Sequence, residues 1–336
     1  MKKVSLADIA NSLGVSKTLV SMVLNGKRDQ MGISKRTQEK VMAKAKEMKY
    51  RPSHFARGLR SGKSNTIGLV ISDISNPFYA EICKAVETTV RKNNRNLLIC
   101  STNEETLNES NIIEMMVEKQ VDGVIISSSQ KNVEAFEPLK EAQIPIVFID
   151  RKMNVENSGY VGVNNVSGSM QITDHLFSTG KENIGFITIG PAHASSLAER
   201  KEGFSEALME HAKIPEEFIF EFDFHTFEDE INAKLTDIIK NHNLDAIYTA
   251  NNNIAKVALK TLRKNNVLIG KDIAFASFDD IPLFELLSPG VTAVRQPVSE
   301  IGVEAVKILN QYVDEQKKGN LEKILSTELI IRESSQ

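Results

Sequence analysis

Cysteine is scarce in this chain and long apolar runs are missing, which narrows the kinds of protein it can be. The two cysteines, Cys83 and Cys100, lie in apolar surroundings, so we expect buried reduced thiols rather than a disulfide or a metal site. No stretch approaches the roughly 18 apolar residues of a membrane-spanning helix. The first residues also lack the apolar core of a signal peptide. We therefore expect a soluble, cytoplasmic protein with no membrane partner.

Motifs of common enzyme classes are missing as well. There is no phosphate-binding G-x-x-x-x-G-K-[ST] loop and no serine within G-x-S-x-G. The six histidines are scattered, without the spacing of metal ligands. These absences weigh against an enzyme such as a sugar kinase, and we expect no enzyme activity, no cofactor and no metal.

Charge is distributed unevenly, although the whole chain carries a net charge of only −3. Residues 1–65 contain 15 Lys and Arg but only four Asp and Glu, a net charge of +11, and the remainder carries −14. A basic segment attached to an acidic body indicates a polyanionic partner that binds at one end of the molecule. Such binding should weaken steeply with salt, because counterions are released from phosphates.

Residues 4–25 have the pattern of two short helices joined by a tight turn. Ser5 and Asp8 form a capping box for the first helix, Gly14 ends it, and Ser16 can cap the second. The inward-facing positions would be Leu6, Ile9, Ala10, Leu13, Val20, Val23 and Leu24. This pattern predicts a helix-turn-helix, whose second helix enters the major groove of DNA. An ordinary helical pair in a core is the alternative, and the charge distribution disfavours it.

The second helix would present an outward face to DNA, formed by Lys17, Thr18, Ser21, Met22 and Asn25. A third helix beginning at Ser34 would close the core with Val41, Ala45 and Met48. We therefore predict an all-α DNA-binding domain over residues 1–50.

Residues 51–63 form the predicted linker, in which residues 53–62 could make barely two helical turns. A helix shorter than about 12 residues is marginal in water, so we expect it to fold only against DNA and a second copy. Leu59 is an apolar residue between Arg57 and Arg60, which suits a wedge between base steps in the minor groove. A linker leucine that rests on the next domain is the alternative.

Four motifs follow one another in order: VSKTLVSMVLNG at residues 15–26, YRP at 50–52, ARGL at 56–59 and IGLV at 67–70. This series closely resembles the lactose-repressor (LacI/GalR) family along essentially the entire chain. The resemblance implies a homodimer or tetramer on a pseudo-palindromic double-stranded DNA operator, a hinge helix in the minor groove, and a sugar-binding-protein-like effector domain. The residues expected at the DNA are Ser5, Ser16, Lys17, Thr18, Ser21, Met22, Asn25, Ala56, Arg57 and Leu59.

Two residues of the second helix depart from the family pattern. Leu19 and Met22 stand where the family usually has Thr or Val and Arg. An arginine there can bind guanine O6 and N7 together, so its loss predicts a different half-site at that base.

From residue 66 onward, short apolar runs alternate with amphipathic stretches. Predicted strands are residues 66–72, 96–101, 123–127, 145–150, 184–189, 218–222, 245–250, 272–278 and 325–332, and predicted helices are 77–93, 108–119, 133–142 and 298–316. Apolar strands that alternate with helices predict parallel sheets covered on both faces, and their number exceeds one ordinary sheet.

We therefore predict an α/β fold with two lobes, like a periplasmic binding protein, after the helix-turn-helix domain. Residues 64–336 would form this effector-binding domain. Its first lobe would contain residues 64–163 and 294–323, since the chain should return after Pro289 and Gly290. Its second lobe would contain residues 164–293 and 324–336.

Ligands of open α/β sheets bind beyond the carboxyl ends of the strands, so strand-end residues should line a cleft between the lobes. Phe78 and Tyr79 would stack on a sugar ring or a base, or simply pack the start of a helix. Arg151 would hold an anion or a pair of hydroxyls, or form an ion pair that stabilises the lobe.

The family resemblance adds further effector-binding residues. Arg200 precedes Gly and an aromatic residue as in the family, Asn251 and Asp279 would bind hydroxyls, and Phe224 would close the pocket. Asn164 stands in place of the family's usual Asp, and so does Asn252. Both changes remove negative charge and leave room for a phosphorylated or acidic effector.

We predict a transcriptional regulator, usually a repressor in this family, controlled by a small effector for which a sugar or sugar phosphate is the first choice. Control by a protein corepressor on the first lobe is the alternative. The basic segment at residues 1–65 argues against a secreted solute-binding protein. Because no leucine heptad tail follows the last strand, we expect a dimer.

Overall fold

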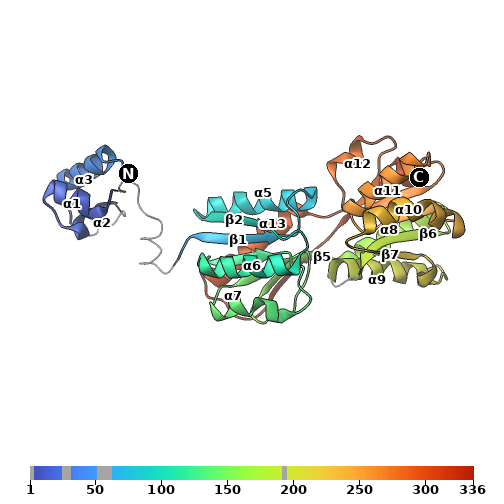
Figure 1. Cartoon of the computed structure of the whole chain (residues 1–336), viewed down its shortest axis with the longest axis horizontal. Coiled ribbons are helices and arrows are strands. Elements are labelled where there is room, and N and C mark those ends of the chain that lie inside the picture. Colours follow the sequence, from blue (N-terminus) through green and yellow to red (C-terminus); the bar gives the residue numbers. More distant parts are fainter. Residues whose placement is uncertain (1–3, 25–31, 51–62, 191–194) are drawn as a thin grey trace. The chain divides into compact units, whose positions relative to one another are not determined.

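The computed structural model describes residues 4–24, 32–50, 63–190 and 195–336. The chain divides into two units, Met1–Ser64 and Asn65–Gln336 (Figure 1).

The first unit is a three-helix domain whose helix starts are set by capping serines. α1 (Leu6–Leu13) begins at the Ser5–Asp8 capping box and ends at Gly14, whose φ of 66° is left-handed. α2 (Lys17–Leu24) follows Ser16, whose Oγ accepts the N–H of Leu19 at 3.1 Å. α3 (Lys35–Glu47) follows the capping residue Ser34. The predicted helix starts are confirmed, and the small core consists of Ile9, Ala10, Val20, Val23, Val41 and Ala45.

The first lobe of the second unit is a parallel sheet with helices on both faces (Figure 1). Its strand order is β11-β5-β4-β3-β1-β2. The strands are β1 (Thr66–Ile71), β2 (Asn96–Ser101), β3 (Gly123–Ile126), β4 (Ile146–Ile149), β5 (Gly159–Val163) and β11 (Leu321–Leu325). One apolar core lies between the sheet and the helices α5 (Pro77–Lys92) and α13 (Val298–Val313). The other lies against α6 (Thr106–Glu118) and the short α7 (Glu137–Glu141).

The second lobe repeats this architecture with the order β12-β10-β9-β8-β6-β7. Its strands are β6 (Ile184–Gly190), β7 (Ile219–Asp223), β8 (Ala246–Thr249), β9 (Ala274–Phe278), β10 (Thr292–Arg295) and β12 (Glu328–Ile330). Its helices are α8 (Asn165–Ser178), α9 (Ser195–Glu210), α10 (Phe227–Asn241), α11 (Asn252–Lys264) and α12 (Pro282–Leu286). All of its strand pairs are parallel except that of β12 with β10.

The described chain crosses between the lobes after β5, after β10 and after β11. The crossing after β10 corrects the predicted return after Pro289 and Gly290 and the lobe boundary at residue 294, because β10 runs to Arg295 and still pairs with β9 of the second sheet. The predicted last strand, residues 325–332, is wrong as a single element. The stretch contains the end of β11 in the first sheet and all of β12 in the second, separated by Ser326 and Thr327.

Further segments differ from the sequence prediction, among them β10, which was not predicted as a strand. β5 was not predicted, because Gly159 and Gly162 interrupt its apolar run. The helix predicted over residues 133–142 is a 3-10 turn, Val133–Phe136, followed by α7.

The two cysteines are free thiols, Cys83 buried and Cys100 half-buried, as expected for the first and only partly so for the second. None of the helices in the described ranges combines the length and the apolar character that crossing a membrane requires.

Candidate functional site

The carboxyl ends of the strands from both lobes line one cleft with a volume of about 980 Å³. The first lobe contributes the segments after β1, β2 and β4, and the second lobe those after β6, β7, β8 and β9. This is where parallel α/β sheets bind ligands, because helix starts and loop side chains converge there. Seven of the eight predicted effector residues line the cleft, namely Phe78, Tyr79, Arg151, Arg200, Phe224, Asn251 and Asp279.

Arg200 lies between carboxylates from the two lobes. It comes from α9 and is only 3% exposed. Its Nε donates to Asn165 Oδ1 at 2.9 Å, and one Nη donates at 2.9 Å to the carbonyl oxygen that follows β8. Its Nη atoms lie 3.9 Å from Asp150 Oδ1 and 3.6 Å from Asp279 Oδ2. Both carboxylates are thus at ion-pair distance but beyond ordinary hydrogen-bond distance, which leaves them acceptor capacity for a ligand.

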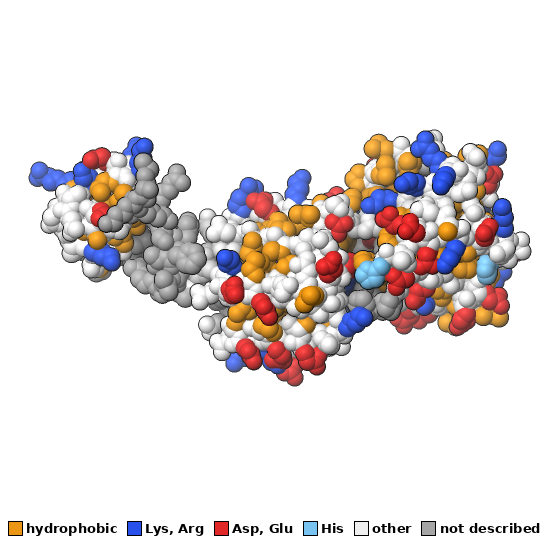
Figure 2. Space-filling view, viewed as in Figure 1, with side chains coloured by type: hydrophobic (Ala, Val, Ile, Leu, Met, Phe, Trp, Pro, Cys, Tyr) orange, Lys and Arg blue, Asp and Glu red, His pale blue; other side chains and the backbone are white. Residues whose placement is uncertain are grey.

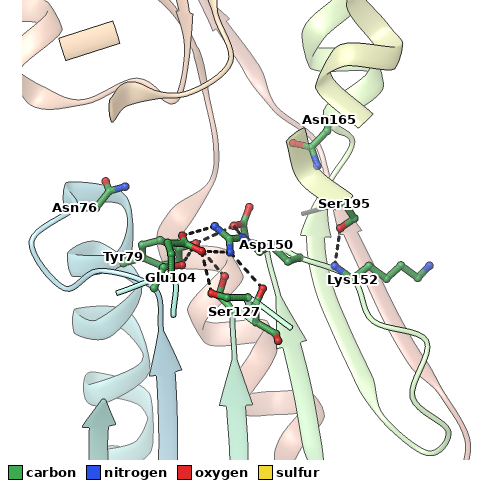
Figure 3. A network of polar contacts seen from close by, with 12 residues as sticks. Asn76, Tyr79, Glu104, Ser127, Asp150, Lys152, Asn165 and Ser195 are labelled. Atoms are coloured by element: carbon green, nitrogen blue, oxygen red, sulfur yellow. Dashed lines mark hydrogen bonds and ion pairs between the residues drawn. The ribbon is translucent and has the colours of Figure 1, made fainter. Parts of the chain in front are cut away.

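Tyr79 holds Asp150 from the first-lobe side. Its hydroxyl lies 3.0 Å from Asp150 Oδ2, 2.9 Å from Ser127 Oγ and 3.0 Å from Ser72 Oγ (Figure 3). Burial and the Asp150 carboxylate raise the pKa of Tyr79, so the hydroxyl keeps its proton and donates a hydrogen bond to this carboxylate. Tyr79 is 4% exposed and Phe78 is 8% exposed, so packing of the helix start accounts for most of the surface of these residues.

Arg151 forms an ion pair with Glu104, a residue of the loop after β2. The two Nη atoms donate to the two carboxylate oxygens at 2.6 and 2.5 Å. Burial alone would raise the pKa of the Glu104 carboxyl, but the Arg151 charge and hydrogen bonds outweigh it and lower that pKa. The ion pair, one of the two roles that the sequence left open for Arg151, is present in the structure.

Asp279 follows β9 with a left-handed φ of 70° and is 7% exposed. Gln296, in the crossing after β10, donates to its Oδ1 at 2.6 Å. Burial raises the pKa of Asp279, against the opposing effects of Arg200 and Gln296. The carboxylate is therefore connected both to the central arginine and to a segment that joins the lobes.

Asparagine side chains cap the start of α11 and form a hydrogen bond between the two lobes. Asn251 caps α11, because its Oδ1 accepts the N–H groups of Asn253 and Ile254. The Nδ2 of Asn252 donates at 2.9 Å to Asn76 Oδ1, which belongs to the other lobe. This amide pair therefore links the cap of α5 to the first residue of α11.

Asn164 is the predicted effector residue that the structure does not bring to the cleft. Its side chain is exposed and caps α8, accepting the N–H of Ser167 at 2.9 Å. The neighbouring Asn165 is buried and contacts Arg200 and Glu199. A shift of one position at the start of a helix turns a side chain away from the cleft.

Sequence reasoning missed several cleft residues. Asp150 adjoins the predicted Arg151 at a strand end, so its position was a usable signal. Asn252 was singled out for its missing charge but was not predicted to bind the effector. Glu104, Gln296 and Asn76 gave no such signal, because their partners lie 47, 17 and 176 residues away in sequence.

The structure describes some of the residues that were predicted to contact DNA. Lys17 and Thr18 on α2 and the preceding Ser16 are exposed, and Ser21 and Met22 are half-buried. Ser5 and Ser16 both serve as helix caps. On the view in Figure 2, Lys and Arg side chains are more prominent on this unit than Asp and Glu. Asn25, Ala56, Arg57 and Leu59 lie outside the described residues.

Comparison with known proteins finds a family match in each of the two units. Residues 5–53 match the lacI family of bacterial regulatory proteins, and residues 173–335 match a periplasmic binding protein-like domain. The ribose operon repressor of Halalkalibacterium halodurans is 32% identical over 332 residues, 98% of this chain and 97% of that protein.

Two solved structures extend the comparison. A transcriptional regulator CelR–cellobiose complex is 26% identical, with a TM-score of 0.72 and coverage of 99% of this chain and 100% of that one. The lac repressor dimer bound to operator and the anti-inducer ONPF is 22% identical, covers 99% of both chains and has a TM-score of 0.83, a likeness of fold. The chain therefore belongs to the lacI family: it is a helix-turn-helix transcriptional regulator, not an enzyme, with a periplasmic-binding-protein-like effector domain.

Proposed function

We propose that the cleft binds a small polyhydroxylated effector, a sugar or sugar phosphate, and that this ligand controls how tightly the helix-turn-helix domain binds its operator. The observation that carries the proposal is Arg200, held between Asp150 of one lobe and Asp279 of the other at 3.9 and 3.6 Å. Paired carboxylates and a guanidinium are acceptors and donors of the kind that recognise neighbouring hydroxyl groups.

The relatives support this ligand class by what their names state. One is a ribose operon repressor, and another was solved in complex with cellobiose. The cleft of this chain adds amides from Asn251 and the aromatic ring of Phe224 to the charged groups. Apolar rings beside a few polar groups are typical of small-molecule sites.

A ligand in this cleft would touch both lobes and so bias their relative position. Asp279 accepts from Gln296 of the crossing segment, which gives a direct path from ligand to interlobe connection. Hinge closure around a ligand is a common switch, and such coupling is typically about 1–3 kcal/mol and reciprocal between sites.

The operator would be read by Lys17 and Thr18, supported by Ser5, Ser16, Ser21, Met22 and Asn25, with Ala56, Arg57 and Leu59 in the minor groove. We further propose a homodimer on a pseudo-palindromic operator in the cytoplasm, by analogy with the operator-bound lac repressor dimer. Two-fold symmetric proteins match two-fold symmetric sites.

Thermal unfolding of the full-length chain against sugars, sugar phosphates, nucleobases and small acids tests the proposed ligand class. A ligand at about 100 times its Kd stabilises by about 2.7 kcal/mol. We expect a sugar or a sugar phosphate to raise Tm. If the panel is silent while operator binding is intact, a protein corepressor becomes the better explanation.

A further inference from the structure

The cleft holds a second arginine, on the first-lobe side, whose charge is already neutralised. Arg151 lines the cleft at the end of β4, and its side chain is 13% exposed. Both Nη atoms donate to the Glu104 carboxylate, whose side chain is 18% exposed. An unpaired guanidinium at this place would attract a phosphate or carboxylate, since such pairs are bidentate and charge-assisted.

Glu104 is held in position by its own surroundings. Asn103 and Glu104 both adopt left-handed backbone conformations, with φ of 54° and 61°. The Oγ of Ser129 donates to Glu104 Oε2 at 2.9 Å. Ser129 is fixed in turn, because its N–H donates at 2.7 Å to Glu109 Oε2. The carboxylate is thus part of the wall of the cleft rather than a mobile surface group.

The balance of buried charge depends on this one residue. The ion-paired side chains of the cleft, each with less than one-fifth of its surface exposed, are Arg151, Arg200, Glu104, Asp150 and Asp279. Three acids face two bases, so an anion that enters meets an excess of negative charge. Without the charge of Glu104 the two signs would balance. The cleft lysines Lys131, Lys256 and Lys260 are exposed, where solvent and salt screen their charges.

We propose that Glu104 determines the charge of the ligand: by neutralising Arg151 it makes the cleft select neutral polyhydroxylated ligands and reject phosphorylated or carboxylated ones. The inference rests on the proposed ligand-binding role of the cleft and narrows it. Glu104 acts here as a specificity residue that lines the site.

The test uses the full-length chain and the variant Glu104→Gln, which keeps the size of the side chain and one of its two hydrogen-bonding oxygens but removes its charge. Inorganic phosphate and ribose 5-phosphate are titrated by calorimetry and thermal unfolding. We expect no measurable binding to the unchanged chain and measurable binding to Glu104→Gln, at least roughly tenfold tighter than the detection limit set by the unchanged chain, since one buried opposing charge is removed. Glu105→Gln is the matched control, because Glu105 is an exposed cleft carboxylate of the same loop and should leave phosphate binding unchanged.

Two more variants make the outcome decisive. Glu104→Ala covers the case in which Glu104→Gln folds poorly, and adding Arg151→Gln to Glu104→Gln should abolish the phosphate binding that was gained. If phosphate binds equally to the unchanged chain and both Glu104 variants, or to none of them, the ion pair serves only to stabilise the lobe and the inference is wrong.

The outcome of this phosphate-binding test does not depend on whether the proposed function is correct. Phosphate affinity is read without DNA, so the charge rule can hold even if no ligand affects operator binding. Conversely, a neutral sugar that regulates operator binding, together with unchanged phosphate affinity in Glu104→Gln, would overturn only the inference.

Discussion

Arg200 is oriented by contacts with its own lobe while it faces one carboxylate from each lobe. Asn165 and a backbone carbonyl hold it in place, and Asp150 and Asp279 remain at looser ion-pair distances. Because these ion pairs are loose, Arg200 and the two carboxylates can replace their contacts with one another by hydrogen bonds to the hydroxyl groups of a ligand. A ligand that does so connects the lobes through one side chain.

Arg200→Ala should therefore abolish the ligand-induced rise in Tm while leaving ligand-free operator affinity within about twofold, because the DNA-binding unit is a separate fold. The variant should also lose stability, since two buried carboxylates lose their common partner. Calorimetry with the ligand and gel shift with the operator measure the two effects. Lys201→Ala is the control, because this neighbour forms an ion pair with Glu221 at a half-exposed position. An unchanged ligand titration would remove Arg200 from the site.

Glu109 gives a prediction about pH. It is completely buried, with Ser128 Oγ and Ser129 N–H donating to its carboxyl oxygens, and burial raises its pKa above the usual 4.5. The folded state therefore binds this proton more readily than the unfolded state does. Its contribution to stability falls as pH rises from 4.5 through the raised pKa.

Urea unfolding of the unchanged chain and Glu109→Gln across that pH window isolates the effect of Glu109, since other groups titrate in both proteins. We expect the stability difference to move in favour of the unchanged chain as the pH is lowered. A difference that is constant with pH would show that Glu109 has an ordinary pKa.

At the scale of elements, close packing of α8 against α9 sets the position of Arg200. Gly203 allows it, because a Cβ there would lie 2.2 Å from the backbone oxygen of Val166. Backbone cannot yield as a flexible side chain does. Gly203→Ala should cost about 1–3 kcal/mol of unfolding free energy and weaken ligand binding through a shifted Arg200.

Urea unfolding with Glu210→Ala as control measures this cost, because Glu210 is exposed on the same helix and should change stability by less than about 0.5 kcal/mol. If Gly203→Ala is as stable as this control, the close approach of α8 and α9 is not a constraint.

Local signals were sufficient for the elements that carry their own caps or unbroken apolar runs. As predicted, Ser5 and Gly14 set the two ends of α1, and Ser34 sets the start of α3. The prediction from the sequence failed where the choice of the neighbouring strand decides the structure. Residues 325–332 were predicted as one strand, and only the partners, β5 and β10, assign Leu325 to one sheet and Glu328–Ile330 to the other. The one-residue difference between Asn164 and Asn165 likewise depends on where α8 begins.

At the scale of the whole molecule, the charge asymmetry of the chain predicts different salt responses for its two binding activities. Operator affinity should fall by roughly 10³-fold or more between about 50 and 200 mM salt, because the basic segment displaces counterions from phosphates. Ligand affinity should change little, since the charges around Arg200 are buried. Fluorescence anisotropy and calorimetry over one salt series check this. A flat operator response would contradict a phosphate-dominated interface.

The site as a whole is less predictable than its single residues. The family pattern led to Arg200, Asn251 and Asp279, which line the cleft as expected. The Asn76–Asn252 pair and the Glu104–Arg151 pair join segments that are distant in sequence, and only the folded sheets bring them together. Long-range pairs of polar residues leave no periodic signal in a single sequence.

The central claim is that a ligand in the cleft changes operator affinity, and operator titration by anisotropy with and without a saturating ligand tests it most directly. The ligand is the one that raises Tm in the thermal panel, and the chain is used at full length. We predict a change in operator Kd of about fivefold or more, in either direction, since coupling of this kind is typically about 1–3 kcal/mol. A ligand that binds and stabilises the protein fully while operator Kd stays the same would contradict the account.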